Sequence, residues 1–431
     1  MRKILIITYY WPPSGGSAVL RWLKFTKYFR DFGWEPVIYT PRNPEPQETD
    51  ESLLKDAPGN LEIVRTHICE PYGIYKWLTG RKQDENLGVA LISDTKKQGF
   101  LSRISLWIRS NLFIPDPRVF WVKPSIRFIS RYLQQNPVEV IISTGPPHSM
   151  HLIARGLKRK LGSRWVADFR DPWTNIDFFR DLPLTAMALR CHRKLELNVL
   201  READHVITVS PGMTSEFRSM GIKHVSTIMN GFDEEPVYPA QDTGNRFTLV
   251  HLGSMPRSRN PQSLWQALSE LVKDNKRFAS RLEIRLVGKT DHSVMDSLSQ
   301  YGLQEYVIRQ EYVPHDQTFS ILSQASALLL CINNTPNAKG ILTNKFFEYL
   351  STQRPILAIG PPDGDVAAIL TETEAGRIFE YQDVRGLKDH LLTLFELYSH
   401  KSLTSGRKDI TRYSRKNLTS ELAELLNKLT S

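Results

Sequence analysis

Short and nearly uninterrupted apolar runs recur along the chain and alternate with amphipathic stretches. Runs of this kind predict strands of parallel sheets that are covered on both faces. In the first half they occupy residues 3–8, 36–40, 138–143, 165–169, 205–210 and 225–229. In the second half they occupy residues 247–253, 282–288, 307–313, 327–332, 355–359 and 377–381.

Helical periodicity fills the intervals between these runs. After the first strand, Ala18, Trp22, Phe25 and Phe29 share one face of a predicted helix, which Gly33 ends. Residues 45–99 show no pattern that assigns a structure. The two series of strands and helices predict the α/β class, with two Rossmann-like, doubly wound domains that face each other across a cleft.

The expected domain ranges follow from the turn-rich stretch between the two series. Residues 236–244 contain two Pro and one Gly with little periodicity, which is typical of a linker. We therefore expect an N-terminal domain at 1–236 and a C-terminal domain at 245–405. The remaining residues, 406–431, include an amphipathic helix at 410–429.

Composition and charge restrict the classes of function. The chain has 431 residues, 41% of them hydrophobic, and three widely spaced Cys, so no disulfide framework is indicated and a reducing cytoplasm is favoured. No apolar stretch approaches the ~20 residues of a membrane span. The net charge of +10 favours an anionic partner: nucleic acid, an acidic membrane surface or a phosphorylated small molecule. The absence of basic blocks and zinc-finger spacings argues against nucleic acid.

Ligands of such sheets bind beyond the carboxyl ends of the strands, and two of the loops there are suited to phosphate. In WPPSGGSA, Gly15 and Gly16 let backbone amides approach an anion at a helix start; the alternative is a tight turn. In NAKGILTNKFFEYL, a helix is expected to begin near Asn344 or Lys345, and Lys345 suits a diphosphate there. Glu348, one turn later, can accept hydrogen bonds from sugar hydroxyls or merely complement the helix dipole.

Two further loops carry candidate catalytic groups. In WVADFRDPW, Asp168, Arg170 and Asp171 lie at and beyond a strand end, where they form either a catalytic group or a structural ion-pair cluster. In STGPPHSMH, we expect His148 to be exposed at a helix start and to hydrogen-bond a substrate, whereas His151 packs in the helix. No carboxylate accompanies these His at ligand spacing, so no metal site is expected.

Residues 101–135 mix basic and aromatic side chains. Six Lys or Arg stand against one acid, for a net charge of +5, and six aromatic residues lie among them. This mixture suits a surface that touches anionic lipid headgroups. The alternative is a helix pair with aromatics in the core and basic residues in solvent.

Several motifs resemble the GT-B glycosyltransferases of family 4 over essentially the whole chain. KFFEYLSTQRPILAIG resembles their donor-nucleotide signature, and HLGSMPRSRNPQSLWQAL resembles their first C-domain strand, loop and helix. ADHVITVSPGMTSEF and IMNGFDEE resemble the segment that closes their N-domain. DFRDPW looks like the version found in a bacterial subgroup. In the family the C-terminal helix crosses back onto the N-domain.

The resemblance implies roles for individual residues. Glu348 would hold the ribose of the donor, and the Asn344 and Lys345 amides would hold its diphosphate. Arg259 would also bind the diphosphate, at a position where the family commonly has Lys. Gly340 stands where the family has a carboxylate near the donor sugar.

Two other positions depart from the family pattern. Ser254 follows Gly253 where the family has a basic residue, and Arg257 is the candidate that compensates for it. Arg170 or Asp171 stands where family members often have a His near the reacting sugar.

The resemblance implies a retaining, metal-independent glycosyltransferase without a cofactor. It would move a sugar from a nucleotide-diphosphate donor to a hydroxyl of a glycan or of a lipid-linked acceptor. The expected location is the cytoplasm, at the inner face of the membrane. Two alternatives are a non-catalytic GT-B subunit that binds a nucleotide or a partner, and a nucleotide-sugar 2-epimerase.

Overall fold

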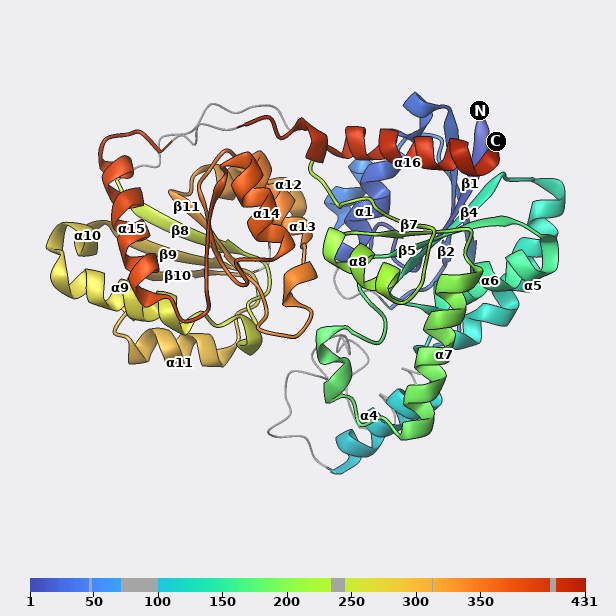
Figure 1. Ribbon diagram of the computed structural model, residues 1–431, viewed down its shortest axis with the longest axis horizontal. Coiled ribbons are helices and arrows are strands. Elements are labelled where there is room, and N and C mark those ends of the chain that lie inside the picture. Colours follow the sequence, from blue (N-terminus) through green and yellow to red (C-terminus); the bar gives the residue numbers. More distant parts are fainter. Residues whose placement is uncertain (46–48, 71–99, 234–244, 312, 404–407) are drawn as a thin grey trace. The chain divides into compact units, whose positions relative to one another are not determined.

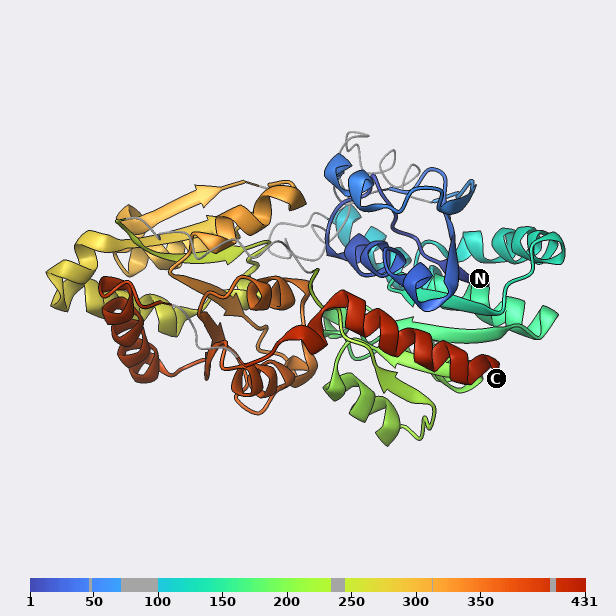
Figure 2. The same cartoon turned by 90° about the horizontal axis from the view of Figure 1, so that it is seen from above.

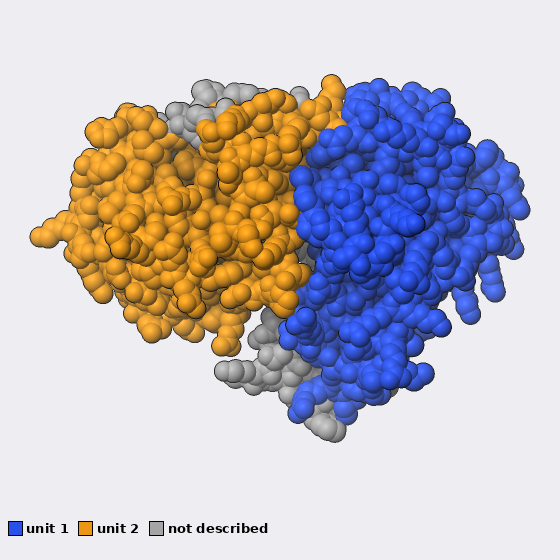
Figure 3. Space-filling model, in the orientation of Figure 1, with its two compact units in different colours: residues 1–229, 418–431 blue, residues 230–417 orange. Residues whose placement is uncertain are grey.

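The chain forms two compact α/β units. The computed structural model describes residues 1–45, 49–70, 100–233, 245–311, 313–403 and 408–431. The N-terminal unit comprises Met1–Met229 and Leu418–Ser431, and the C-terminal unit comprises Asn230–Asn417 (Figures 1 and 3). The expected linker at 236–244 lies outside the described residues, so the expected domain ranges stay predictions.

The N-terminal unit is built on a seven-stranded parallel sheet with the order β3-β2-β1-β4-β5-β6-β7. Its strands are β1 (Arg2–Ile7), β2 (Trp34–Pro41), β3 (Glu62–Thr66), β4 (Val140–Gly145), β5 (Arg164–Phe169), β6 (His205–Thr208) and β7 (Val225–Thr227). The six strands that the sequence predicts here are confirmed, and β3 is additional. The strand order reverses between β1 and β4, which is the point where ligands bind in sheets of this type.

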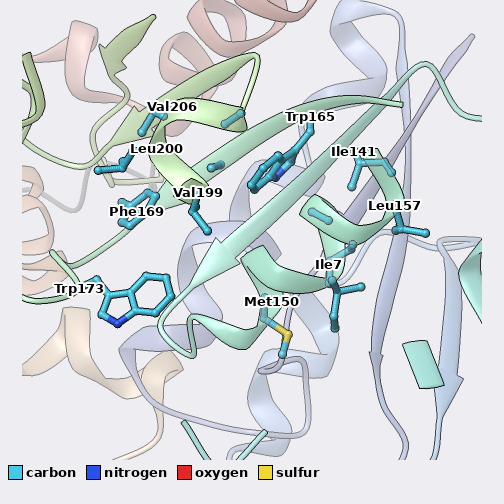
Figure 4. Packing of buried hydrophobic residues seen from close by; sticks show 14 of the residues in the cluster. Ile7, Ile141, Met150, Leu157, Trp165, Phe169, Trp173, Val199, Leu200 and Val206 are labelled. Atoms are coloured by element: carbon cyan, nitrogen blue, oxygen red, sulfur yellow. The ribbon is translucent and has the colours of Figure 1, made fainter. Parts of the chain in front are cut away.

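Helices cover both faces of this sheet (Figure 1). They include α1 (Ser17–Thr26), α5 (Val119–Gln135), α6 (Ser149–Leu161), α7 (Ala186–Glu202) and α8 (Pro211–Ser219), whereas α4 (Phe100–Leu112) contacts α7. Successive strand residues point to opposite faces, so Ile4 and Ile6 join one core cluster while Leu5 and Ile7 join another. Figure 4 shows the second cluster, in which Trp165 and Phe169 of β5 pack against α6 and α7.

The first helix is shorter than expected. It ends at Thr26, and Phe29 lies in a separate 3-10 turn, η1 (Phe29–Phe32). Gly33 ends that turn in the left-handed conformation, with φ 81°. Phe25 and Phe29 are both fully buried, so the apolar face was identified correctly although the helix is interrupted.

The last helix, α16 (Arg415–Thr430), belongs to the N-terminal unit through Leu418–Ser431, as the resemblance implies. Its Leu422 and Leu426 are fully buried in the same cluster as Ile4 and Ile6. Figure 2 shows α16 lying along this unit. The helix begins at Arg415 rather than at residue 410, because Thr411–Tyr413 form a 3-10 turn, η7.

The C-terminal unit contains a six-stranded parallel sheet with the order β10-β9-β8-β11-β12-β13. Its strands are β8 (Phe247–Leu252), β9 (Leu282–Val287), β10 (Val307–Gln310), β11 (Ala327–Cys331), β12 (Ile356–Ile359) and β13 (Gly376–Phe379). The helices that matter for the site are η4 (Arg257–Arg259), α12 (His315–Ser323) and α13 (Asn344–Ser351). All six strands and the start of α13 at Asn344 agree with the sequence analysis.

Candidate functional site

The loop after β8 forms the floor of a cluster in the C-terminal unit. Gly253 has φ +90°, a conformation that L side chains rarely adopt, and a Cβ there would lie 3.3 Å from Lys345 Nζ. Gly288, after β9, packs against the Gly253 backbone, since a Cβ on it would lie 3.0 Å from Gly253 C and O. The two glycines therefore allow two loops and one ammonium group to meet at the carboxyl edge of the sheet.

Lys345 lies in the first turn of α13 and contacts His251 of β8. The His251 Nδ1 group lies 3.0 Å from the Leu329 carbonyl oxygen of β11 and donates to it, because a carbonyl can only accept. The other ring nitrogen, Nε2, then accepts from Lys345 Nζ at 3.5 Å. Burial and the neighbouring Lys345 charge hold the pKa of His251 well below its usual range. A neutral imidazole therefore holds the ammonium group without cancelling its charge.

The charge of Lys345 is costly in this environment. Burial, and then the nearby Arg259 guanidinium, lower the pKa of Lys345 to about 7, although Glu348 acts in the opposite direction. A bound anion would relieve this cost, because an opposite charge favours the ammonium form. The site is therefore prepared for a negatively charged ligand.

Arg259 supplies a second cation in the same cluster. It ends η4 and is half-buried, and its Nε donates to Asn333 Oδ1 at 2.5 Å. Asn333 follows β11, and its carbonyl oxygen accepts a hydrogen bond from the Tyr381 hydroxyl at 3.0 Å. Ser254 and Arg257 are exposed on the loop that joins β8 to Arg259.

Glu348 lies one turn after Asn344 on α13 and is half-buried. Its Oε1 lies 3.3 Å from Nε2 of His315, the first residue of α12. The sequence analysis did not single out His315 or His251. His315 could have been found, because it opens a helix just after a predicted strand, where ligand-binding loops lie.

These groups together can bind a nucleoside diphosphate. The α13 N-terminus presents backbone amides and the positive end of the helix dipole, and Arg259 and Lys345 add two charges. A guanidinium group also fits the geometry of phosphate oxygens. Glu348 is a carboxylate that can accept from a pair of hydroxyls. The structure thus brings Gly253, Arg259, Asn344, Lys345 and Glu348 into one region.

In the N-terminal unit, Asp168 is fully buried and surrounded by donors. It accepts hydrogen bonds from Arg21 Nε at 3.1 Å and Nη2 at 3.0 Å, Trp22 Nε1 at 2.8 Å and Thr144 Oγ1 at 2.7 Å. Its side-chain environment is that of a structural ion pair, which is one of the two alternatives the sequence left open. The catalytic role of Asp168 stays a prediction.

Arg170 and Asp171 lie just beyond β5. The guanidinium group of Arg170 donates to the Ala18 carbonyl at 2.7 Å and also to the Pro146 carbonyl, and burial lowers the pKa of Arg170. It thereby connects the start of α1 to the loop after β4. Asp171 is exposed. Gly16 caps α1 with φ +84° and open space where a Cβ would stand.

The expectation that His148 is exposed is wrong. It is only 8% exposed because its ring stacks on Trp173 with centroids 4.5 Å apart. His151 is fully buried, as expected, against Phe169 and the Ser143 hydroxyl. Burial, together with the charges of His151, Arg170 and His192, keeps the pKa of His148 well below its usual value, so the ring is neutral.

Within the described ranges, neither a metal site nor a membrane span is found. No group of three or more His, Cys, Asp or Glu side chains there could hold a metal ion. No helix in those ranges is long and apolar enough to cross a membrane. The metal-independent mechanism stays a prediction.

Two sequence families match the chain, one in each half. Residues 83–236 match Glycosyltransferase Family 4, and residues 246–396 match Glycosyl transferases group 1. The chain belongs to the family 4 glycosyltransferases. This family 4 enzyme is therefore a glycosyltransferase that takes its sugar from a nucleotide-sugar donor. A comparison with curated protein sequences finds no match.

Solved structures with the same fold span the whole length of this family 4 chain. Sucrose-phosphate synthase from Thermosynechococcus elongatus has a TM-score of 0.65 at 14% identity, and the match covers 100% of this chain and 99% of that one. Anabaena HepE in complex with UDP-glucose has a TM-score of 0.62 at 14% identity, with 99% and 100% covered. A mutant of S. aureus TarM in complex with fondaparinux, alpha-GlcNAc-glycerol and UDP has a TM-score of 0.64 at 11% identity, with 99% and 100% covered. At these identities the likeness establishes the GT-B fold of two Rossmann-like domains.

Proposed function

We propose that this glycosyltransferase binds the diphosphate of its donor between Arg259 and Lys345 and transfers the sugar with retention of configuration. The acceptor is a hydroxyl of a glycan or of a lipid-linked acceptor. The observation that carries the proposal is the convergence of two cations, a helix N-terminus and one carboxylate at the carboxyl edge of the six-stranded sheet. Two of the similar structures are titled as complexes with UDP or UDP-glucose, which supports a nucleotide of this kind.

Glu348 is the proposed clamp for the donor ribose. Its position one turn into α13 places a carboxylate near the cations, and His315 at 3.3 Å fixes the orientation of the carboxylate. A carboxylate accepts from both hydroxyls of a vicinal diol, whereas a deoxyribose offers only one of them. The proposal therefore favours ribonucleotides over deoxyribonucleotides.

Catalysis in this proposal is electrostatic. When the bond between sugar and diphosphate breaks, negative charge develops on the leaving phosphate oxygens. The Lys345 ammonium group gains most from that charge, because burial makes its positive charge costly in the free protein. The acceptor hydroxyl attacks from the face that the nucleotide leaves, so no protein nucleophile is assigned. Gly15, Gly16, Arg170, Asp171 and His148 remain proposed contributors.

The test is a thermal-shift titration of the full chain with UDP, GDP and dTDP. A ligand that binds only the native state raises the melting temperature. We expect one ribonucleotide to give a shift that Glu348→Ala abolishes. Glu305→Gln is the matched control, since Glu305 is an exposed acid of the same unit. No shift with any nucleotide contradicts the donor site.

Turnover then distinguishes the alternatives. Transfer with retention gives a product whose anomeric configuration, measured by NMR, equals that of the donor. Nucleotide binding without any loss of sugar supports a non-catalytic subunit. Release of an epimerised free sugar supports a 2-epimerase.

We further propose that α4 and α5 carry a surface that contacts anionic lipid. On α4, the exposed apolar residues are Ile104 (40%), Trp107 (43%), Ile108 (38%) and Leu112 (65%). On α5, Phe120 and Phe128 are 54% and 41% exposed, and Lys123, Arg127 and Arg131 are exposed beside them. Trp121, in contrast, is buried in the core. Exposed rings among cations suit an interfacial helix pair.

Vesicle sedimentation tests this surface. We expect the protein to sediment with vesicles that contain phosphatidylglycerol and not with neutral phosphatidylcholine vesicles. Trp107→Ser with Phe120→Ser should weaken the binding, whereas Met187→Ser, an exposed apolar residue of α7, should not. Equal sedimentation of both variants contradicts the surface.

A further inference from the structure

A cavity lies in the N-terminal unit, next to Gly15 and Gly16 on the loop that follows β1. It has a volume of about 200 Å³ and lies beyond the carboxyl ends of β1, β2 and β3. Its walls are the loop 11–14, the segments 40–44 and 49, and Arg65. A water molecule occupies about 10–15 Å³ on the same scale. The cavity therefore has room for a group the size of a phosphorylated or acidic monosaccharide.

Backbone contacts hold the loop 11–14 against the segment at Thr49 and Asp50. The Asp50 amide donates to the Pro13 carbonyl at 2.9 Å, and Ser14 forms a β-bridge with Thr49. The register of the sheet fixes the positions of the segment 40–44 and Arg65, because Thr40 of β2 lies opposite Arg65 of β3. The cavity is thus a property of the fold of one unit.

Arg42 and Arg65 supply the charge of the cavity. Arg65 is half-buried, and its Nη2 donates to the Pro12 carbonyl at 3.4 Å, which places the guanidinium group against the proline wall. Arg42 follows β2, and its backbone amide donates to the Thr66 carbonyl at 2.8 Å. Two arginines, Arg65 on β3 and the exposed Arg42 just after β2, therefore line the same space.

No acid lines the cavity in the described part of the chain, and neither guanidinium has a carboxylate partner among those residues. The lining amide of Asn43 is already committed, because it exchanges two hydrogen bonds of 3.0 Å with the Ile68 backbone. Thr40 Oγ1 is directed to the Tyr9 carbonyl. The charged donors that remain for a ligand are the two guanidinium groups.

We propose that this cavity binds an anionic sugar, with its phosphate or carboxylate between Arg42 and Arg65. A guanidinium pair suits such a group because each offers parallel N–H donors that match two oxygens. If the enzyme transfers a sugar as proposed above, this ligand is the acceptor, so the inference names an acceptor that carries negative charge. That last step rests on the proposed function, whereas anion binding by the cavity does not.

The experiment measures binding of three probes to the full chain by calorimetry: glucose 6-phosphate, glucuronate and glucose. It is done with saturating UDP, so that Arg259 and Lys345 do not compete for the anions, and repeated without it. We expect at least one anionic probe to bind and glucose not to bind. Arg42→Gln with Arg65→Gln should weaken the binding by tenfold or more. Arg201→Gln, an exposed arginine of α7, should leave it unchanged.

The outcomes distinguish a sugar phosphate from a uronic acid. They also distinguish failure of the cavity proposal from failure of the proposed donor site. Binding of glucose 6-phosphate alone assigns a sugar phosphate, and binding of glucuronate alone assigns a uronic acid. The inference is wrong if glucose binds as tightly as the anionic probes. It is also wrong if the Arg42→Gln, Arg65→Gln variant binds those probes as tightly as the wild type does. If the wild-type chain binds a probe but does not bind UDP, the proposed donor site is wrong, whereas the proposed anion binding by this cavity is retained.

Discussion

Two charged clusters, one in each unit, show how differently the same fold can use ionic side chains. Asp168 is fully buried in the N-terminal unit and is matched by the charged donor Arg21 at 3.0 Å. Lys345 in the C-terminal unit contacts a neutral imidazole at 3.5 Å instead. Both lie at the carboxyl edge of a parallel sheet, so position alone does not separate a structural charge from a ligand-binding one.

The two charges differ in how far the surrounding groups compensate for their burial. The oxygens of Asp168 accept hydrogen bonds from Arg21, Trp22 and Thr144, so the pair is internally complete. The pKa of Lys345 falls to about 7 because the surrounding groups do not compensate for its burial. Removing one member of a buried, fully paired ion pair therefore destabilises the protein, whereas a buried charge without such compensation can be stabilised by a ligand of opposite charge.

The largest expected effect is on Asp168. Asp168→Ala leaves the buried Arg21 guanidinium without its carboxylate, although the bond to the Met229 carbonyl remains, and we expect it to lower the free energy of unfolding by about 3–5 kcal/mol. Urea unfolding followed by tryptophan fluorescence measures this. Arg21→Met combined with Asp168→Leu removes both charges and should recover much of the loss. If the Asp168→Ala protein is as stable as the wild type but no longer transfers sugar, Asp168 has a catalytic role and not a structural one.

Lys345→Met should have the opposite signature. It removes a costly buried charge, so we expect the melting temperature to stay the same or rise. The affinity for UDP should fall about 10- to 100-fold, because a hydrogen bond to a charged group is worth about 1.5–3 kcal/mol. Thermal melting and calorimetry on the same sample measure both quantities. A large loss of stability with unchanged UDP affinity would place Lys345 among the structural charges.

The pH dependence of UDP binding sharpens the same point. Below pH 7, Lys345 is protonated before UDP binds, so no proton is taken up. Above pH 7, the free protein has lost this proton and must regain it, so the affinity should fall by up to about tenfold per pH unit. Calorimetry between pH 7.5 and 9 measures the slope. Lys345→Arg should flatten it, and an unchanged slope in that variant would assign the proton to another group.

His315→Ala is expected to have the smallest effect. The variant keeps the Glu348 carboxylate but removes the imidazole 3.3 Å from it. We expect the affinity for UDP to fall about three- to tenfold, less than the loss of a direct hydrogen bond to a charged group (about 1.5–3 kcal/mol), because His315 acts on UDP only through Glu348. His315→Gln, which retains a donor, should recover part of the affinity. If both variants bind UDP as the wild type does, His315 does not position Glu348.

The elements of the fold follow from local patterns, and most were predictable. Apolar runs located twelve strands, and the start of α13 followed from its position after the 327–332 run. Strand β3 was missed because it is an edge strand with no fully buried residue, so no apolar run marks it. Since Arg65 lies on this strand, the sequence did not reveal the cavity lined by Arg42 and Arg65 either.

The candidate site was predictable where one segment carries its chemistry, as in Lys345 and Glu348 on α13. It was not predictable where residues far apart in the sequence determine the environment. Arg21 looked like one more polar position on an amphipathic helix, yet it pairs with Asp168, 147 residues away. His148 was expected in solvent because nothing local indicates that Trp173 stacks on it. Tertiary contacts of this kind decide whether a polar side chain is available.

The placement of α16 has a consequence for how the protein is made. The ribosome delivers the chain from its N-terminus, and domains generally fold as they emerge. Leu418, Leu422, Ala423 and Leu426 complete a core whose other buried members lie within residues 4–228, so that core stays incomplete until α16 has been synthesised. The C-terminal unit is continuous in sequence, so it can fold before α16 completes the N-terminal unit. A prematurely terminated chain therefore exposes apolar surface on the N-terminal unit, which marks it for chaperones and proteases before it can act.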